Sequence, residues 1–247
     1  MSQKMGLIGR KLGMTRYFHD DGSSLGCTVL EIGPCVVTGQ LTPDKHGYTA
    51  LQIGFEEQAT RKITRAKSGY FKKVGIEKIP AVVREIRLDD VKQMADRKVG
   101  DVITASQVFK AGDVVDVVGI SKGKGYQGVM KRHQMGGDSA THGTHEFFRH
   151  GGSIGCRLTP QRVHKGKRMA GQMGNEKVTQ QNLQLFRILA DDNVILVRGS
   201  VPGSTNEYVV ITKAATRKQY KRKGMGKEEV RSKNPLKASK KAAAGRG

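Results

Sequence analysis

The stretch Gly123-Lys124-Gly125-Tyr126-Gln127-Gly128 has the glycine spacing of a loop that cradles nucleotide phosphates. A dinucleotide site needs a helix after this loop, but Val129–Met135 runs straight into Gly136-Gly137. A Walker A loop fails as well, because Gly119 and Gly123 are four positions apart where five are needed. The sequence therefore predicts no nucleotide chemistry here. Glycines among lysines instead favour close approach of the backbone to a phosphate-rich surface.

Three histidines and one cysteine in the same part of the chain carry side chains of the kind that bind zinc. They are His142, His145, His150 and Cys156. Their spacings match no common structural zinc pattern, and no C-x-x-C pair accompanies them. Histidines surrounded by glycine, lysine and arginine more often stack on bases or donate to phosphates. We therefore expect no metal and no cofactor.

Cys156 also has His150 and His164 nearby in the sequence, which is the beginning of a cysteine nucleophile with a base. The only carboxylates between residues 121 and 173 are Asp138 and Glu146, and no apolar pattern around them predicts a substrate pocket. We therefore expect a protein that is not an enzyme and that takes no small-molecule substrate.

Positive charge is concentrated in two segments of the chain. The 247 residues carry 44 Lys and Arg against 22 Asp and Glu, a formal net charge of +22. Residues 121–173 hold ten basic and two acidic side chains, and residues 213–247 hold thirteen and two. Both segments are poor in Leu, Ile, Val and Phe, so neither can bury a core of its own. This charge balance predicts a polyanionic partner.

Short apolar runs bounded by Gly, Pro, Asn or Asp predict β-strands in the rest of the sequence. The predicted strands are Leu25–Ile32, Cys35–Leu41, Ala50–Phe55, Ala81–Leu88, Val114–Ile120, Leu183–Leu189, Asn193–Arg198 and Tyr208–Thr212. Asp191-Asp192-Asn193 and Val201–Ser204 have the composition of hairpin turns. Ala59–Lys73 reads as a basic helical or irregular segment, and Asp89–Lys98 as a short helix. Many short strands with such turns predict a closed barrel or a sandwich.

The order of these patterns predicts how the chain is organised. We expect residues 1–120 and 174–212 to form one globular β-barrel with an α+β insertion at about residues 57–110. Residues 121–173 form a long loop between two strand-like runs, and we expect this loop to take its shape only when another molecule supplies its walls. Residues 213–247 are expected to be a basic tail that is disordered when the protein is free.

Composition also predicts the compartment and the kind of partner. No apolar stretch is long enough for a membrane helix or a signal peptide, so we expect a cytoplasmic protein with no membrane contact. Three cysteines fit a reducing compartment, and Cys27 and Cys35 lie in strand-like runs that predict core positions. The chain has no Trp, 5% aromatic residues and no recognition helix, which disfavours readout of DNA. Structured RNA is the expected partner.

Several ordered motifs along about residues 5–216 point to one family. They are Met5–Thr15 (MGLIGRKLGMT), Ser121–Gly125 (SKGKG), Lys131–His133 (KRH), Ala140–Gly143 (ATHG), Gly152–Gly155 (GSIG), Lys165–Gly174 (KGKRMAGQMG) and Val201–Gly203 (VPG). These motifs closely resemble the bacterial form of large-subunit ribosomal protein L-three. The resemblance implies a mainly β fold with a closed six-stranded β-barrel of the translation-protein type, an α+β insertion and a long basic glycine-rich extension. The charge pattern adds a basic C-terminal tail.

The resemblance also implies a function. Members of this family are structural components of the large ribosomal subunit. They bind its RNA near the 3′ end, nucleate assembly and extend a loop toward the peptidyl-transferase centre. By this similarity, the tip of the loop is at about His142–Lys167. We accordingly expect large-subunit ribosomal RNA and neighbouring large-subunit proteins as partners.

We expect RNA contacts from cations near the N-terminus and along the extension. These are Arg10, Lys11, Lys122, Lys124, Lys131, Arg132, His133, His142, Arg149, His150, Arg157, Arg162, His164, Lys165, Lys167 and Arg168. Close backbone approach to RNA is expected at Gly123, Gly125, Gly152, Gly155, Gly166 and Gly171.

Some positions depart from the family pattern. Cys156 stands where some bacterial relatives carry a glutamine that is methylated, so this modification is not expected here. Gly151 replaces a frequent Pro, Gln161 replaces a usual Gly, and the tail beyond about Arg217 is longer than in many bacterial relatives. Two alternative interpretations stay open. One is a free RNA-binding assembly or translation factor, and the other is a nucleotide-using enzyme.

Overall fold

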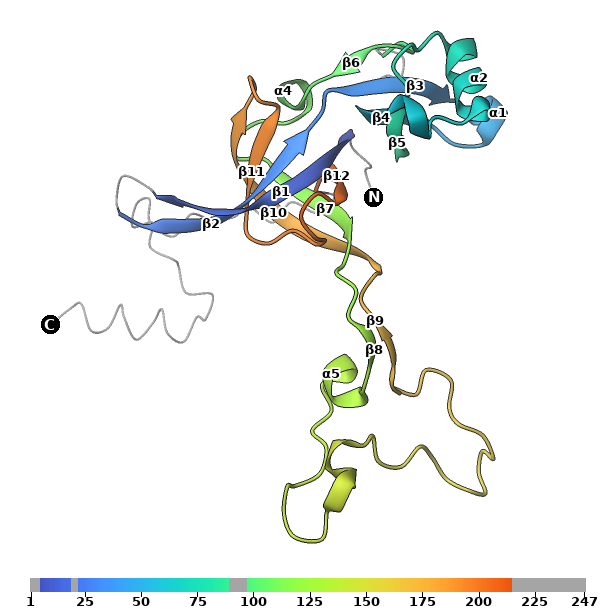
Figure 1. Ribbon diagram of the computed structural model, residues 1–247, viewed down its shortest axis with the longest axis vertical. Helices are drawn as coiled ribbons and strands as arrows, with labels where there is room; N and C mark the ends of the chain where they lie inside the picture. The colour runs from blue at the N-terminus through green and yellow to red at the C-terminus, as the bar shows by residue number, and fades with distance from the viewer. Residues whose placement is uncertain (1–4, 19–21, 89–96, 215–247) are drawn as a thin grey trace, which may run out of the picture. The chain divides into compact units, whose positions relative to one another are not determined.

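The described part of the chain is mainly β-structure and contains a closed six-stranded antiparallel barrel (Figure 1). The structure is a computed structural model that describes residues 5–18, 22–88 and 97–214. The barrel closes in the order β1-β12-β7-β10-β11-β2. Its strands are β1 (Gly6–Phe18), β2 (Ser24–Ile32), β7 (Val114–Ile120), β10 (Lys177–Leu189), β11 (Val194–Arg198) and β12 (Tyr208–Lys213). The predicted β-rich class and the closed six-stranded barrel are confirmed.

The first barrel strand, β1, is absent from the strands that the apolar runs predict. Its glycines Gly6, Gly9 and Gly13 weaken the local strand signal. Two of them are needed where strands approach closely. A Cβ at Gly6 would lie 2.6 Å from the carbonyl oxygen of Ile211 on β12, and one at Gly9 would lie 2.4 Å from that of Glu31 on β2. Close packing of three strands, and not local propensity, therefore selects glycine in β1.

The eight predicted apolar runs all fall on strands, with small differences at the ends. The largest difference is in β10, which begins at Lys177 and not at Leu183, because its polar first half pairs with β7. The turn at Asp191-Asp192-Asn193 joins the paired strands β10 and β11, as predicted. The hairpin predicted at Val201–Ser204 is wrong, because this segment connects β11 to β12, which are not neighbours in the barrel.

A four-stranded sheet is inserted between β2 and β7 along the chain, with strand order β5-β4-β3-β6. Its strands are β3 (Cys35–Leu41), β4 (Ala50–Glu57), β5 (Pro80–Arg87) and β6 (Val102–Ile103), and its helices are α1 (Pro43–His46), η1 (Thr60–Lys62), α2 (Arg65–Val74) and α4 (Ala105–Val108). The inserted sheet therefore begins at Cys35 and not at about residue 57, because β3 and β4 already belong to it. An apolar run predicts that a strand forms, but it does not predict which sheet that strand joins.

The basic segment after residue 59 forms the helical elements η1 and α2, which confirms the helical interpretation. Thr64 caps the start of α2 through its hydroxyl, and Gly75 ends the helix at φ +80°. Phe71 of α2 packs with Ile76 and Ile79 in a small apolar cluster.

One apolar core joins the barrel to the inserted sheet. It includes Leu7 and Ile211 from the barrel and Phe55 from β4, and Phe109 is its largest fully buried side chain. Cys27 and Cys35 are also buried, as predicted. The two sheets are therefore held together by shared apolar contacts, which fix the positions of the polar residues between them.

Between β7 and β10, residues 121–173 form short elements. These are β8 (Gly125–Gln127), α5 (Val129–His133), η2 (His145–Arg149) and β9 (Gly171–Met173). Figure 1 shows β8 and β9 side by side, and they pair as an antiparallel ribbon. No helix in the described ranges is long and apolar enough to cross a membrane. Most of the helix predicted at Asp89–Lys98, and the tail beyond residue 214, lie outside the described residues.

Candidate nucleic-acid interface

Fourteen of the sixteen side chains that are predicted to contact RNA, ten Lys or Arg and four His, lie within residues 121–173. Twelve of them are exposed, and Arg132 and His133 are half-buried. Within the described ranges, none of the fourteen forms an ion pair. The same segment contains only two carboxylates, Asp138 and Glu146. Its positive charge is therefore uncompensated, and it can attract a polyanion.

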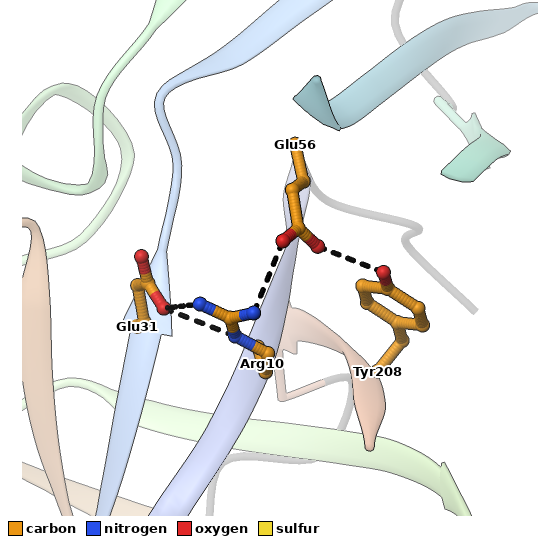
Figure 2. Close-up of polar contacts among 4 residues, drawn as sticks. All are labelled: Arg10, Glu31, Glu56 and Tyr208. Carbon is orange, nitrogen blue, oxygen red and sulfur yellow. Dashed lines mark hydrogen bonds and ion pairs between the residues drawn. The ribbon is translucent and has the colours of Figure 1, made fainter. Parts of the chain in front are cut away.

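Arg10 differs from these fourteen, because other parts of the protein hold its guanidinium. Figure 2 shows it between Glu31 of β2 and Glu56 of β4. Its Nη2 donates to Glu31 Oε2 at 2.8 Å, and its Nη1 donates to Glu56 Oε1 at 3.0 Å. The other oxygen of Glu56 accepts a 2.7 Å hydrogen bond from the hydroxyl of Tyr208 on β12. Arg10 is thus placed at the junction between the barrel and the inserted sheet.

The same contacts shift two pKa values. The hydrogen bond to Glu31 raises the pKa of Arg10. The hydrogen bond to Glu56 raises the pKa of Tyr208, because the carboxylate favours the phenol over the phenolate. The raised pKa values favour the charged guanidinium of Arg10 and the neutral phenol of Tyr208, which are the forms that donate these hydrogen bonds. The shifts therefore support a structural role for Arg10.

Lys11 also has partners inside the protein. The side chain is buried, with 8% of its surface exposed. Its Nζ donates hydrogen bonds to the carbonyl oxygens of Val201, at 2.7 Å, and Gly203, at 2.9 Å. Burial lowers the pKa of Lys11, and the positive charge of Lys122 lowers it further. Lys11 therefore holds the segment between β11 and β12 against β1, and its contact with RNA stays a prediction.

The ends of the extension are tied together by backbone hydrogen bonds. We define the root of the extension as residues 121–134 with residues 169–176. The N–H of Lys124 donates to the carbonyl of Met173 at 2.9 Å, and that of Ser121 donates to the carbonyl of Glu176 at 2.8 Å. The N–H of Asn175 donates back to the carbonyl of Ser121 at 3.0 Å. The root therefore has regular structure formed within the chain, and the predicted loop that takes its shape from another molecule stays a prediction for the distal part of residues 121–173.

Helix α5 forms the other part of the root. Arg132 Nη1 donates to the carbonyl oxygen of Met169 at 2.8 Å, and His133 Nε2 lies 3.0 Å from the same oxygen. Val129 of α5 is buried. A short helix thus does follow the glycine-rich stretch, contrary to the expectation from Gly136-Gly137. Residues 125–127 are nevertheless paired in β8, so the stretch is not an open phosphate loop between a strand and a helix.

A cavity of about 680 Å³ lies where the root meets the barrel. Its charged and titratable lining residues are Lys11, Lys122, Lys124, Arg132, His133 and Glu176. We call this cavity the root groove. Four Lys and Arg side chains and one carboxylate line it, so an anion is the ligand that its charge favours.

A second cavity, of about 410 Å³, lies beside η2 and is lined by His142, His145 and Phe148 among others. Within the described ranges, no three His, Cys, Asp or Glu side chains come together in a way that could hold a metal ion. Cys156 is exposed. The structure therefore does not bring the histidines and Cys156 together into a zinc site.

The six glycines at which close backbone approach is predicted differ in their surroundings. For Gly123, Gly125, Gly152, Gly155 and Gly166, an added Cβ would meet no atom closer than 3.8 Å. At Gly171, a Cβ would lie 2.6 Å from Nη1 of Arg132. This atom is the far end of a flexible side chain, and close approach of RNA at all six glycines stays a prediction.

Comparison with known proteins decides the family. The profile of a family described as Ribosomal protein L3 matches residues 56–193. The chain belongs to this family.

Three relatives, each named large ribosomal subunit protein uL3, extend the match. The protein from Geotalea daltonii is 49% identical over 206 residues, which is 83% of this chain and 95% of the relative. The protein from Trichlorobacter lovleyi is 48% identical with the same coverage. The protein from Herpetosiphon aurantiacus is 46% identical over 210 residues, which is 85% of this chain and 96% of the relative.

Membership of the ribosomal protein L3 family confirms the resemblance seen in the motifs. It also makes the chain a structural ribosomal protein and not an enzyme. Sequence reasoning missed the junction residues Glu31, Glu56 and Tyr208. The one available signal was the strand register that places Glu31 opposite Arg10, and this register is visible only once β1 is known to be a strand.

Proposed function

We propose that this protein is a structural component of the large ribosomal subunit and binds the RNA of that subunit directly through residues 121–173. One observation carries the proposal. The ten Lys and Arg side chains in this segment form no ion pair within the described ranges, and nine of them are exposed. Exposed cations that neutralise phosphates release condensed counterions, which drives binding to RNA.

The family resemblance supports a more specific role. The barrel, of the translation-protein type, anchors the protein near the 3′ end of the large-subunit RNA, where it nucleates assembly. The distal part of the extension, about His142–Lys167, points toward the peptidyl-transferase centre. Neighbouring large-subunit proteins are further partners, the basic tail from residue 213 is a second RNA contact, and the assembled protein resides on cytoplasmic ribosomes.

A charge-neutralising variant of the full chain tests the RNA-binding segment. Substituting Gln for Arg157, Arg162, Lys165 and Lys167 removes four exposed cations from the distal extension. We expect weaker binding to purified large-subunit RNA. If each cation contacts one phosphate, the slope of log K against log salt falls by about 3. Filter binding over a series of KCl concentrations measures both quantities.

A matched control separates position from net charge. Substituting Gln for Arg61, Arg65, Lys72 and Lys73 removes the same number of exposed arginines and lysines from the helical segment of the insertion. We expect this variant to bind nearly as the wild type does. Equal losses in the two variants would mean that net charge alone matters. Unchanged binding by the distal variant would contradict the proposal.

The alternative of a free assembly or translation factor makes a different prediction. A structural component stays with purified large subunits through a high-salt wash, whereas a factor is released. Retention of the full chain on washed subunits, measured by sedimentation, therefore distinguishes the two.

A further inference from the structure

The root groove has walls whose positions are set by hydrogen bonds within the protein. On the barrel side, the buried Lys11 ammonium is fixed by the carbonyls of Val201 and Gly203. On the ribbon side, backbone hydrogen bonds hold Ser121 and Lys124 to the strand that returns to the barrel. All of these bonds are formed within the chain itself.

The side of the groove formed by α5 is fixed by a side-chain clamp. Arg132 and His133 both contact the carbonyl oxygen of Met169, at 2.8 and 3.0 Å. This clamp joins the two arms of the extension just before the distal loop begins. The hydrogen bond to Met169 uses one N–H of the Arg132 guanidinium, which has five N–H donors. The clamp therefore positions a cation on the groove wall and leaves donors that can bind a ligand.

The groove also brings cations together with little compensation. Lys11, Lys122, Lys124 and Arg132 line one cavity, and Glu176 is the only carboxylate among its lining residues. Lys11 and Lys122 are close enough for the charge of Lys122 to lower the pKa of Lys11. Repulsion of this kind costs free energy in the free protein and is relieved when an anion binds between the cations.

We infer that the root groove is formed before RNA arrives and receives the phosphodiester backbone of an RNA strand, a role that rests on the proposed RNA binding. The root is then a preformed anchor, and the distal loop follows the RNA that the anchor has captured. The chemistry of the groove fits this ligand, since a line of phosphates matches cations on several walls.

A variant that keeps the net charge tests the geometry. In Gly171→Ala, the new Cβ would lie 2.6 Å from Nη1 of Arg132, so the guanidinium must shift from the position in which it donates to Met169. Gly136→Ala is the matched control in the same extension, because its Cβ would meet no atom within 4 Å. The probe is a short fluorescent oligouridylate, which has no duplex structure. We expect Gly171→Ala to weaken its binding by about tenfold and Gly136→Ala to leave it unchanged.

A second pair of variants tests the groove even if Gly171→Ala folds poorly. Lys122→Gln with Lys124→Gln removes two groove cations, and Lys165→Gln with Lys167→Gln removes two exposed cations from the distal loop. We expect the groove pair to reduce oligouridylate binding by about tenfold and the distal pair by about threefold or less, because hydrogen bonds hold the backbone that carries the groove pair. Equal losses in the two pairs would overturn the inference.

Hydrogen exchange of the full chain without RNA tests whether the root is preformed. We expect the amide groups of Ser121, Lys124 and Asn175 to exchange slowly, because they donate to carbonyls within the root. Exchange as fast as in residues 151–168 would overturn the inference.

The outcomes of these experiments also separate this inference from the proposed function. Wild-type protein that fails to bind large-subunit RNA refutes the proposed function. RNA binding that the groove pair does not weaken more than the distal pair refutes the preformed groove alone.

Discussion

The ammonium of Lys11 donates a 2.7 Å hydrogen bond to the carbonyl oxygen of Val201, 190 residues further along the chain. A second bond, of 2.9 Å, goes to the carbonyl of Gly203. Lys11 is thus a buried cation whose partners are backbone carbonyls and not a carboxylate. Buried acceptors of this kind are expensive to leave unpaired, which makes Lys11 important for stability.

Lys11→Met is expected to lower the free energy of unfolding by about 1–3 kcal/mol, because it leaves the carbonyls of Val201 and Gly203 without a donor. Denaturant unfolding measures the difference. Lys110→Met, which removes an exposed lysine, is the control and should change stability by less than about 0.5 kcal/mol. If the two variants are equally stable, the hydrogen bonds of Lys11 do not contribute to the free energy of unfolding.

The lowered pKa of Lys11 adds a pH dependence with a definite sign. The folded protein releases the lysine proton at a lower pH than the unfolded chain does. Between the lowered folded pKa and the ordinary lysine value, the unfolded state therefore binds more protons, and stability rises with pH. We expect the wild type to gain stability relative to Lys11→Met across this alkaline window. A constant difference between the two would contradict the shift.

Tyr208→Phe removes the hydrogen bond to Glu56 and is expected to destabilise the protein by about 1 kcal/mol at neutral pH. The pKa of Tyr208 is raised by this bond, so the stabilisation is complete below the ordinary tyrosine value and is lost as the pH rises through the folded pKa. The stability difference from wild type should therefore shrink only above about pH 10. Tyr126→Phe is the control, since this tyrosine is 76% exposed.

Gly9→Ala is expected to destabilise the barrel by about 2–3 kcal/mol, because the added Cβ would lie 2.4 Å from the carbonyl oxygen of Glu31. Gly13→Ala, in the same strand, would meet no atom within 4 Å and should stay within about 0.5 kcal/mol of the wild type. Thermal or denaturant unfolding measures the stability of the two variants. Similar losses at both positions would show that close strand packing is not the reason for glycine at residue 9.

Thiol labelling should distinguish the three cysteines. Cys156 is exposed, whereas Cys27 and Cys35 are buried. Burial raises the pKa of Cys35 to about 11, so its reactive thiolate is about one part in a thousand at pH 8. In the native protein we expect one thiol to react quickly with a disulfide reagent, and Cys156→Ser should abolish that phase. Fast reaction of a second thiol would contradict the buried positions.

Several features could be predicted because their signals are local in the sequence. Apolar runs such as Val114–Ile120 mark strands wherever they are placed, since a strand needs only neighbours that bury one face. The concentration of cations in residues 121–173 predicts an exposed segment, because so few apolar residues cannot form a core. The ordered motifs predicted the family for the same reason, since each can be read without knowing the fold.

Other features were decided only by tertiary structure. Arg10 and Lys11 are adjacent cations in a family motif, and nothing local separates them from the cations of the extension. Glu56 comes from a second sheet and Val201 from the opposite end of the chain, and these partners give Arg10 and Lys11 structural roles. Ion pairs and hydrogen bonds act over a few ångströms in space, so the partner of a charged residue depends on which distant segments the fold brings beside it.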